Sequence, residues 1–187
     1  MNTPSHLVIN LALLSQTLAP NTLWAISVGA ILPDVPIFIF YAVAKGIYQL
    51  PEKQIWTEAY YQSMVQFWVA LGHSFPLAIV GLVVSLYWRS GLGITFFASI
   101  IGHFLLDIPV HNDDAHRHFF PVSDFRFISP LSYWDVRHHA RWVAAGEFLS
   151  VLALTPLVWQ RSDNLYLRGG LVLLNAGYLL IYPGFWR

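Results

Sequence analysis

Histidine and aspartate residues interrupt several hydrophobic segments of this 187-residue sequence. His6 begins the first apolar stretch, Asp34 lies between two prolines in the second, and His73 lies inside the third. His103 and Asp107 are four residues apart in the next segment, so they share one face of a helix. Ionisable side chains inside a hydrophobic span are costly, and each of these five is therefore a candidate for a functional site.

The positions of these residues within their segments predict similar depths. At about 1.5 Å of helix rise per residue, Asp34 lies about 15 Å from one end of its segment, and His73 lies about 12 Å in from the same side. His103 is at a similar depth, Asp107 is shallower, and His6 starts on that side too. This convergence predicts one site. The alternative is that each residue is a separate hydrogen-bond partner between helices.

The donor types predict a divalent metal ion. The sequence has no Cys, so imidazole nitrogen and carboxylate oxygen would be the ligands. This donor set suits Zn²⁺ or Mn²⁺ first, and also Fe²⁺. Five candidate ligands exceed the roughly three protein ligands of a catalytic zinc ion, so one or two of them would only orient the others. Asp107 and Asp34 are the first candidates for that orienting role.

A His-, Asp- and Arg-rich stretch, residues 112–141, follows the fourth hydrophobic segment. We expect it to fold as a cap over the metal site, although a simply solvated loop is the alternative. Asp114, His116 and His118 are the predicted catalytic residues, acting as general base or acid. Arg117 and Arg126 would bind an anionic group of the substrate, or else contact lipid headgroups.

The elements that position these residues are predicted to be membrane helices. Hydrophobic residues make up 56% of the sequence, charged residues only 11%, and the mean hydropathy is +0.53. A soluble domain carries about a quarter charged residues, so most of this surface does not face water. Hydrophobic segments of spanning length, about 20 residues, cover 23–44, 65–88, 92–111 and 142–160. A fifth covers 165–184, and a shorter stretch covers 4–18.

The predicted fold is therefore an all-α polytopic membrane helix bundle of five to six hydrophobic helices. It forms a single domain over residues 1–187, with the cap loop, 112–141, inside it. The first apolar stretch lacks a basic region before it, so we expect it to be retained. If all six segments span, Lys and Arg divide seven to three between the two sides, which predicts a cytoplasmic cap loop. A net charge of zero gives no indication of nucleic-acid binding.

Four short motifs occur in the order of a known family. Pro4-Ser5-His6, Leu32-Pro33-Asp34, Gly72-His73-Ser74 and His103-x-x-x-Asp107 resemble those of the bacterial membrane-bound metal-dependent hydrolases. The resemblance covers roughly residues 1–111 and implies a small inner-membrane helical fold with a metal site. Two positions depart from the family pattern: Pro36 replaces a second Asp, and Gly72 replaces a Thr. A second metal ion would then depend on the loop histidines.

Three functions remain open at this point. The favoured hypothesis is a metal-dependent hydrolase that acts on an ester or phosphoester of a membrane lipid or lipid-linked substrate. The first alternative is a non-enzymatic membrane binding or assembly protein with a structural metal or polar cluster, and nothing in the sequence indicates a protein partner. The second alternative is a small metal or proton transporter. Only Glu147 and Asn175 would continue a polar path to the other membrane face.

Overall fold

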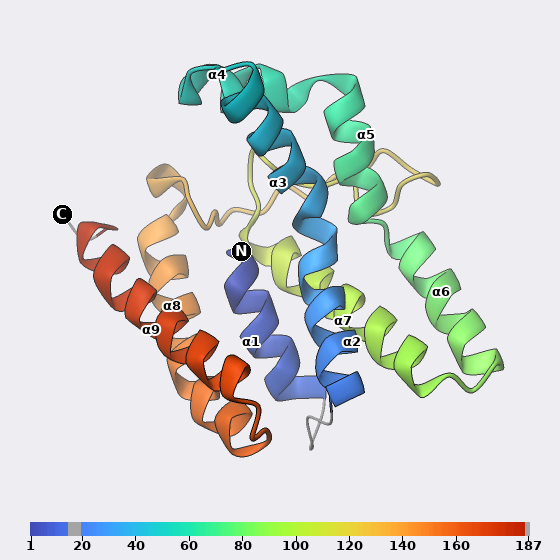
Figure 1. Ribbon diagram of the computed structural model, residues 1–187. Coiled ribbons are helices and arrows are strands. Elements are labelled where there is room, and N and C mark those ends of the chain that lie inside the picture. Colours follow the sequence, from blue (N-terminus) through green and yellow to red (C-terminus); the bar gives the residue numbers. More distant parts are fainter. Residues whose placement is uncertain (15–19, 186–187) are drawn as a thin grey trace.

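The computed structural model describes residues 1–14 and 20–185, which contain helices and no β-strand. This confirms the predicted all-α class. The nine α-helices of these residues are shown in Figure 1. They are α1 (Thr3–Leu14), α2 (Pro20–Ile31), α3 (Val35–Ala42), α4 (Glu52–Thr57), α5 (Ser63–Gly72), α6 (Phe75–Tyr87), α7 (Gly91–Asp107), α8 (Ala140–Gln160) and α9 (Leu165–Phe185).

Four helical segments are long and apolar enough to cross a membrane. They are Asn21–Ile47, Ser63–Tyr87, Gly91–Val110 and Ala140–Gln160. Two shorter apolar stretches are α1 and Leu165–Leu180, which belongs to α9. The predicted segment 4–18 corresponds to α1, and its predicted end at residues 15–18 lies outside the described residues.

Three of the long segments change direction or helix type close to a candidate site residue. In the first, a 3₁₀ turn, Leu32–Asp34, separates α2 from α3. In the second, His73 and Ser74 separate α5 from α6. In the third, α7 ends at Asp107 and continues as a 3₁₀ turn. Pro33 and Pro109 explain two of these changes, because a proline lacks the amide that an α-helix requires.

Small residues allow the helices to approach closely around these breaks. A Cβ added to Gly29 of α2 would lie 2.5 Å from the carbonyl oxygen of Phe96 in α7. A Cβ added to Gly72, next to His73, would lie 2.8 Å from the carbonyl oxygen of Pro33. Close backbone approach through small residues is typical of membrane helix interfaces. At Gly72 it brings the breaks that carry His73 and Asp34 together.

Buried polar side chains connect the three central helices. Asn10 of α1 donates to the Ser99 carbonyl of α7 at 2.8 Å, and the Ser99 hydroxyl donates to the Ile26 carbonyl of α2 at 2.7 Å. An apolar core lies beside these bonds and joins α1, α2, α8 and α9; it includes Val8, Leu11, Ile26, Val151 and Val158. The site helices therefore have a fixed register relative to one another.

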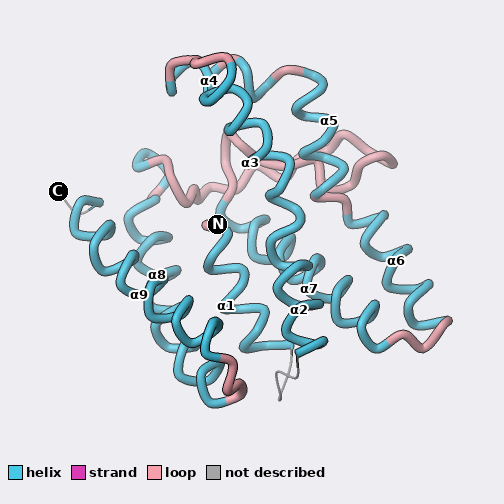
Figure 2. The backbone as a smooth tube through the Cα atoms, viewed as in Figure 1, coloured by secondary structure: helices cyan, strands magenta, loops and turns pink. Residues whose placement is uncertain are grey.

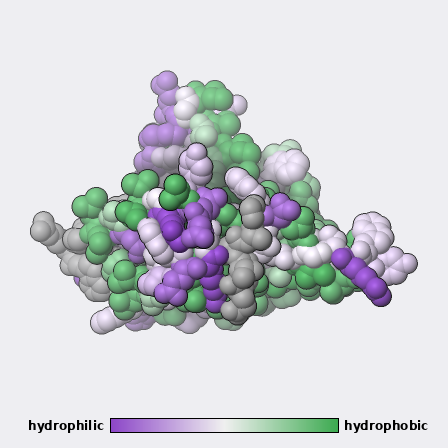
Figure 3. All heavy atoms as spheres, turned by 60° about the horizontal axis from the view of Figure 1, so that its bottom comes forward, coloured by the Kyte–Doolittle hydropathy of each residue, from purple (hydrophilic) through white to green (hydrophobic). Residues whose placement is uncertain are grey.

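The surface is apolar over much of its area, as expected for a protein that contacts lipid. Figure 3 shows the face at the bottom of Figure 1, with hydrophobic residues over much of it and hydrophilic residues gathered near its centre. Large apolar side chains point outward on the long segments, including Ile39, Trp68, Val80 and Leu105. Removing such groups from water is favourable at about 25 cal/mol per Å², and a bilayer provides that environment.

The cap loop folds back onto the helices, as Figure 2 shows for the long loop between α7 and α8. The Phe75 amide of α6 donates to the His118 carbonyl at 2.8 Å, and the Tyr133 amide donates to the Val110 carbonyl at 2.9 Å. The exposed surface of the cap loop is less polar than its composition suggests. Val122 and Ile128 are among its exposed side chains, at 79% and 65% of their full accessible area.

Candidate metal centre

The structure brings six His and Asp residues into two groups that could each hold a metal ion. All six are buried, and within each group the potential ligand atoms lie within 4.8 Å of one another. One group is His6, Asp34 and His103, and the other is His73, Asp107 and His116. Five of the six are the predicted metal ligands. The sixth, His116, comes from the cap loop and was predicted as a catalytic residue instead.

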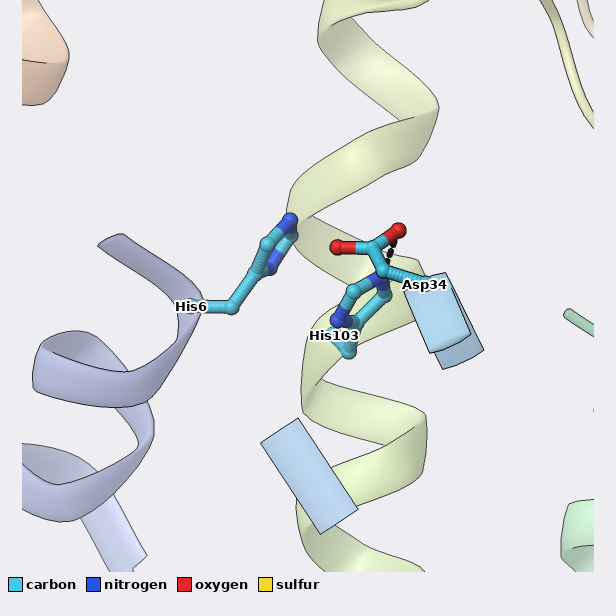
Figure 4. Close-up of side chains that lie close together, drawn as sticks. All are labelled: His6, Asp34 and His103. Atoms are coloured by element: carbon cyan, nitrogen blue, oxygen red, sulfur yellow. Dashed lines mark ion pairs between the residues drawn. The ribbon is translucent and has the colours of Figure 1, made fainter. Parts of the chain in front are cut away.

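The first group joins α1, α7 and the turn between α2 and α3, as shown in Figure 4. The imidazoles of His6 and His103 are stacked, with ring centroids 3.7 Å apart. Nε2 of His103 lies 3.6 Å from Oδ1 of Asp34. The hydroxyl of Thr3 donates to the other oxygen of the same carboxylate, Oδ2. The first turn of α1 therefore supplies both a candidate ligand and a hydrogen bond that orients Asp34.

The second group joins the α5–α6 break, the end of α7 and the cap loop. The rings of His73 and His116 lie 3.9 Å apart, and Nε2 of His73 lies 3.8 Å from Oδ2 of Asp107. The same Oδ2 lies 3.0 Å from Nε2 of His103, which belongs to the first group. Asp107 thus lies between the groups, and the two candidate metal positions are adjacent.

Backbone carbonyls determine which imidazole nitrogens face the centre. Nδ1 of His73 donates to the Val69 carbonyl at 2.9 Å, and Nδ1 of His103 donates to the Ala30 carbonyl at 2.8 Å. A carbonyl oxygen only accepts, so Nδ1 carries a proton in each ring, and in the neutral imidazole Nε2 keeps its lone pair. Both Nε2 atoms are buried and face the carboxylates of Asp34 and Asp107 at 3.0–3.8 Å. Metal-binding histidines are typically held in this way.

The charge of the centre also indicates a cation. Asp34 and Asp107 have 8% and 1% of their accessible area exposed. Two buried carboxylates need compensating positive charge, because an unpaired ion in an apolar environment is costly. The N-terminal ammonium, 2.8 Å from Oδ1 of Asp107, supplies part of it. A divalent cation would supply the rest, and so would protonated imidazoles in a purely structural cluster.

The cap loop places its predicted catalytic residues at or next to this centre. Nε2 of His116 is buried without a hydrogen-bond partner. The pKa of His116 is held well below its usual value, first by burial and then by the neighbouring His73. A neutral imidazole is the form that binds a metal ion. His118 is also buried, its Nδ1 lies 3.2 Å from the His73 carbonyl, and burial lowers its pKa to about 4. A proton-transfer role for either remains a prediction.

Asp114, the third predicted catalytic residue, contacts a histidine that the sequence indicated less directly. Its Oδ2 lies 3.0 Å from Nδ1 of His111, and Nε2 of His111 lies 3.1 Å from Oδ1 of Asp107. Burial lowers the pKa of His111, but the carboxylates of Asp107 and Asp114 outweigh burial and raise it. In the sequence, the four-residue spacing of Asp107 and His111 on one helix face was the signal for the contact between these two residues.

The two predicted anion-binding arginines bond within the protein. Arg117 donates to Asp124 at 2.9 Å and to the carbonyl of Gln66 at 2.8 Å. Arg126 donates to the Ala115 carbonyl at 2.8 Å and to the Gln66 side chain at 3.0 Å. These bonds attach the cap loop to α5. Binding of a substrate anion by either arginine remains a prediction.

Glu147 of α8 has a positioning function that the sequence did not reveal. Its carboxylate accepts hydrogen bonds from the Ser5 hydroxyl at 2.5 Å, the Tyr178 hydroxyl at 2.9 Å and the Asn2 side chain at 3.0 Å. With the Asn2 backbone amide, which donates at 3.1 Å, four donors satisfy this buried charge. They fix the start of α1 and therefore the position of His6. A buried acidic residue in an apolar helix was the only sequence signal.

A pocket of about 920 Å³ opens beside the centre. Asp34, His111, Asp114 and His116 line one end of it. The remaining walls come from the first three residues, α3, α4 and the segment that follows α4, and the cap loop; they include Phe38, Tyr41, Trp56, Tyr60, Tyr61, Tyr133 and Trp134. The candidate metal centre is thus accessible to a ligand of substantial size.

Comparison of the chain with family models, with curated proteins and with solved structures finds no match.

Proposed function

We propose that this protein is a membrane-embedded, metal-dependent hydrolase that acts on an ester or phosphoester of a membrane-associated substrate. The observation that carries the proposal is the pocket beside the buried Nε2 atoms. A structural metal site is closed by protein ligands, whereas a catalytic one needs an open position for water or substrate. Here the pocket reaches residues of both groups, Asp34 and His116.

The residues fit a pair of divalent ions better than a single one. Four imidazoles and two carboxylates, six donors in all, exceed what one catalytic zinc ion binds. The position of Asp107 between the groups, with Oδ2 facing both His103 and His73, suits a carboxylate shared by two ions. Nitrogen and oxygen donors without sulfur favour Zn²⁺ or Mn²⁺. We propose that His116 of the cap loop acts as a ligand in place of the second Asp that the family resemblance implies and that is Pro36 here.

The chain's own residues would then divide the work of hydrolysis. A bound divalent ion polarises the scissile group and lowers the pKa of water toward about 7. His73 and His103 would hold it through nitrogens that backbone carbonyls orient. His111 lines the pocket with Asp114 at its Nδ1, which places this pair to move a proton to or from the reacting group. The aromatic walls would exclude bulk water and hold the apolar part of the substrate.

The apolar surface supports a membrane location for this activity. We propose that the four long segments cross a membrane, a bacterial inner membrane if the motif resemblance reflects ancestry. The Lys and Arg distribution favours a cytoplasmic cap loop. The pocket lies on the cap side of the bundle, so a lipid or lipid-linked substrate would reach it from the adjacent leaflet.

Metal analysis of matched loop variants tests the proposal. Protein produced with Zn²⁺ and Mn²⁺ present should contain about two metal ions per chain, as in two-metal hydrolytic sites. His116→Gln should lose one ion, whereas His118→Gln should keep both because His118 belongs to neither group. The absence of bound transition metal from the unaltered protein would refute the proposal.

Hydrolysis provides the second measurement. The metal-loaded protein should cleave bis(p-nitrophenyl) phosphate or p-nitrophenyl butyrate in detergent, and Asp107→Asn should lower the rate by at least about 10²-fold. If the metal is present but short-chain phospholipids and both of these probes remain intact, the assembly-protein alternative takes its place.

A further inference from the structure

The pocket beside the metal centre has two chemically different ends. At one end, His116 is 4% exposed and its Nε2 is unpartnered, and Asp34 belongs to the other metal group. At the other end, aromatic side chains and acidic groups line the wall. The pocket therefore suits a ligand with two unlike parts, one of which faces the metal centre.

The second end is an aromatic wall formed by α3, α4 and the turn after α4. Tyr41 and Trp56 are stacked with ring centroids 5.6 Å apart, and Trp56 lies 5.8 Å from Tyr60. Tyr60 in turn contacts Tyr61 edge-on at 5.2 Å. Trp56 keeps 42% of its accessible area exposed and Tyr61 keeps 43%, so ring surface remains free to contact a ligand.

Acidic residues predominate over cations along the pocket. Glu52, Asp113, Asp114 and Asp34 line it, whereas its cations are Lys53 and the N-terminal ammonium of Met1. Glu52 pairs with Lys45 at 2.8 Å, and Asp114 lies 3.0 Å from Nδ1 of His111. The two arginines that bind the cap loop to α5, Arg117 and Arg126, are not among those residues.

Asp113 is the acidic group whose charge the described residues compensate least. No Lys, Arg or His of the described residues lies within ion-pair distance of its carboxylate. Burial and the adjacent Asp114 raise the pKa of Asp113, as expected where negative charge is concentrated. The Tyr61 hydroxyl lies 3.5 Å from the Asp113 carbonyl, so this carboxylate is next to the aromatic wall and favours a cation there.

We propose that the aromatic end of this pocket binds the ammonium headgroup of a zwitterionic membrane lipid. A cation over the face of Trp or Tyr is attracted by the ring quadrupole, and quaternary ammonium groups are recognised in this way. The phosphodiester of the same lipid would face the metal end. That second placement rests on the proposed function, whereas recognition of the ammonium group does not.

A binding measurement with two matched lipids tests this recognition. Short-chain phospholipids with a choline headgroup and with a neohexyl headgroup, the uncharged all-carbon isostere of choline, are titrated calorimetrically into the protein in detergent. The choline lipid should bind more tightly, by about 2- to 30-fold, which corresponds to the roughly 0.5–2 kcal/mol of a cation–π contact. Equal affinities would overturn the proposal. An ethanolamine lipid tells whether the preference extends to a primary ammonium.

Matched variants assign the preference to the pocket. Trp56→Leu should bring the affinity ratio close to one, and Trp56→Phe, which keeps a ring, should leave an intermediate ratio. Trp68→Leu is the control, because Trp68 is 51% exposed on α5 and outside the pocket. Asp113→Asn should lower the ratio, and Glu58→Gln, outside the pocket, should not. A ratio unchanged in Trp56→Leu would place recognition elsewhere and overturn the proposal.

The ratio of the affinities for the choline and neohexyl lipids also separates this proposal from the proposed function. Both lipids carry the same phosphodiester, so its contribution cancels in the ratio. Asp107→Asn, expected to lose metal and turnover, should keep the preference for the choline lipid. If the unaltered protein prefers the choline lipid but has no hydrolytic activity, the pocket proposal is supported and the proposed hydrolase is refuted. Hydrolysis without a preference for the choline lipid would support the proposed hydrolase and refute the pocket proposal.

Discussion

Removing the metal with a chelator should destabilise the protein, and the size of this effect should depend mainly on the carboxylate of Asp107. Four imidazoles surround it: His6 at 2.9 Å, His103 at 3.0 Å, His111 at 3.1 Å and His73 at 3.8 Å. Asn has the same shape but no charge, so Asp107→Asn keeps the packing and removes the anion that both metal groups face. The variant should therefore fold and lose most of its metal affinity.

The expected size follows from binding linkage. A metal ion at about 100 times its Kd stabilises the native state by about 2.7 kcal/mol. For a protein of this length, each kcal/mol shifts Tm by about 2–4 °C, so the chelator should lower Tm by about 5–11 °C. Asp107→Asn has little metal left to lose, and its Tm should change by less than about 2 °C on the same treatment.

Thermal unfolding in detergent with and without EDTA measures both shifts. Asp124→Asn is the control, because Asp124 is 80% exposed and pairs only with Arg117 of the cap loop. It should respond to EDTA as the unaltered protein does, and added Zn²⁺ should restore Tm in both. If EDTA shifted Asp107→Asn as much as the unaltered protein, Asp107 would not be a ligand. If EDTA shifted neither protein, the His–Asp cluster would instead be a structural ion-pair network.

Three further perturbations test the topology and the positioning of the centre. Ser123→Cys in the cap loop should resist a membrane-impermeant thiol reagent in intact cells, whereas Asp163→Cys should react with it. Labelling of the cap loop from outside would contradict the cytoplasmic assignment. Glu147→Gln should weaken metal binding about 10- to 100-fold in a chelator competition, because it loosens the start of α1 without touching the metal; unchanged affinity would remove it from the positioning role. Gly72→Ala should cost about 1–3 kcal/mol, since its Cβ would lie 2.8 Å from a backbone carbonyl, while Gly146→Ala, with no atom within 4 Å, should not lower Tm. Equal Tm values for the two glycine variants would show that the close approach at Gly72 is not required.

The sequence by itself determined the class of fold and the composition of the centre. Hydrophobic length is a local property of the chain, so the segments around Asp34, His73 and His103 could be read from residue types alone. Similar depth within those segments then predicted that the three side chains meet. The breaks at Asp34 and after Asp107 followed from prolines whose missing amides no tertiary contact can restore, whereas the break at His73 and Ser74 was not predicted.

Only the tertiary structure decided what the cap loop contributes. Irregular segments carry no periodicity from which their path can be read, and their course depends on contacts with distant residues. The bond between the Phe75 amide and the His118 carbonyl is such a contact, and it joins residues from two different segments. It places His116 among the candidate ligands, while Arg117 and Arg126 are directed toward Gln66 of α5.

The position of α1 is likewise a tertiary property. His6 and Glu147 are far apart in sequence, and neither residue type specifies its partner. The hydrogen bonds of Glu147 to Ser5 and Asn2 fix the start of α1, so that His6 reaches His103. Burial creates that requirement, because a carboxylate enclosed among apolar helices must find donors on whichever helix packs against it. Residue type and segment length thus specified the candidate ligands and the candidate spans, whereas packing between segments decided which groups converge.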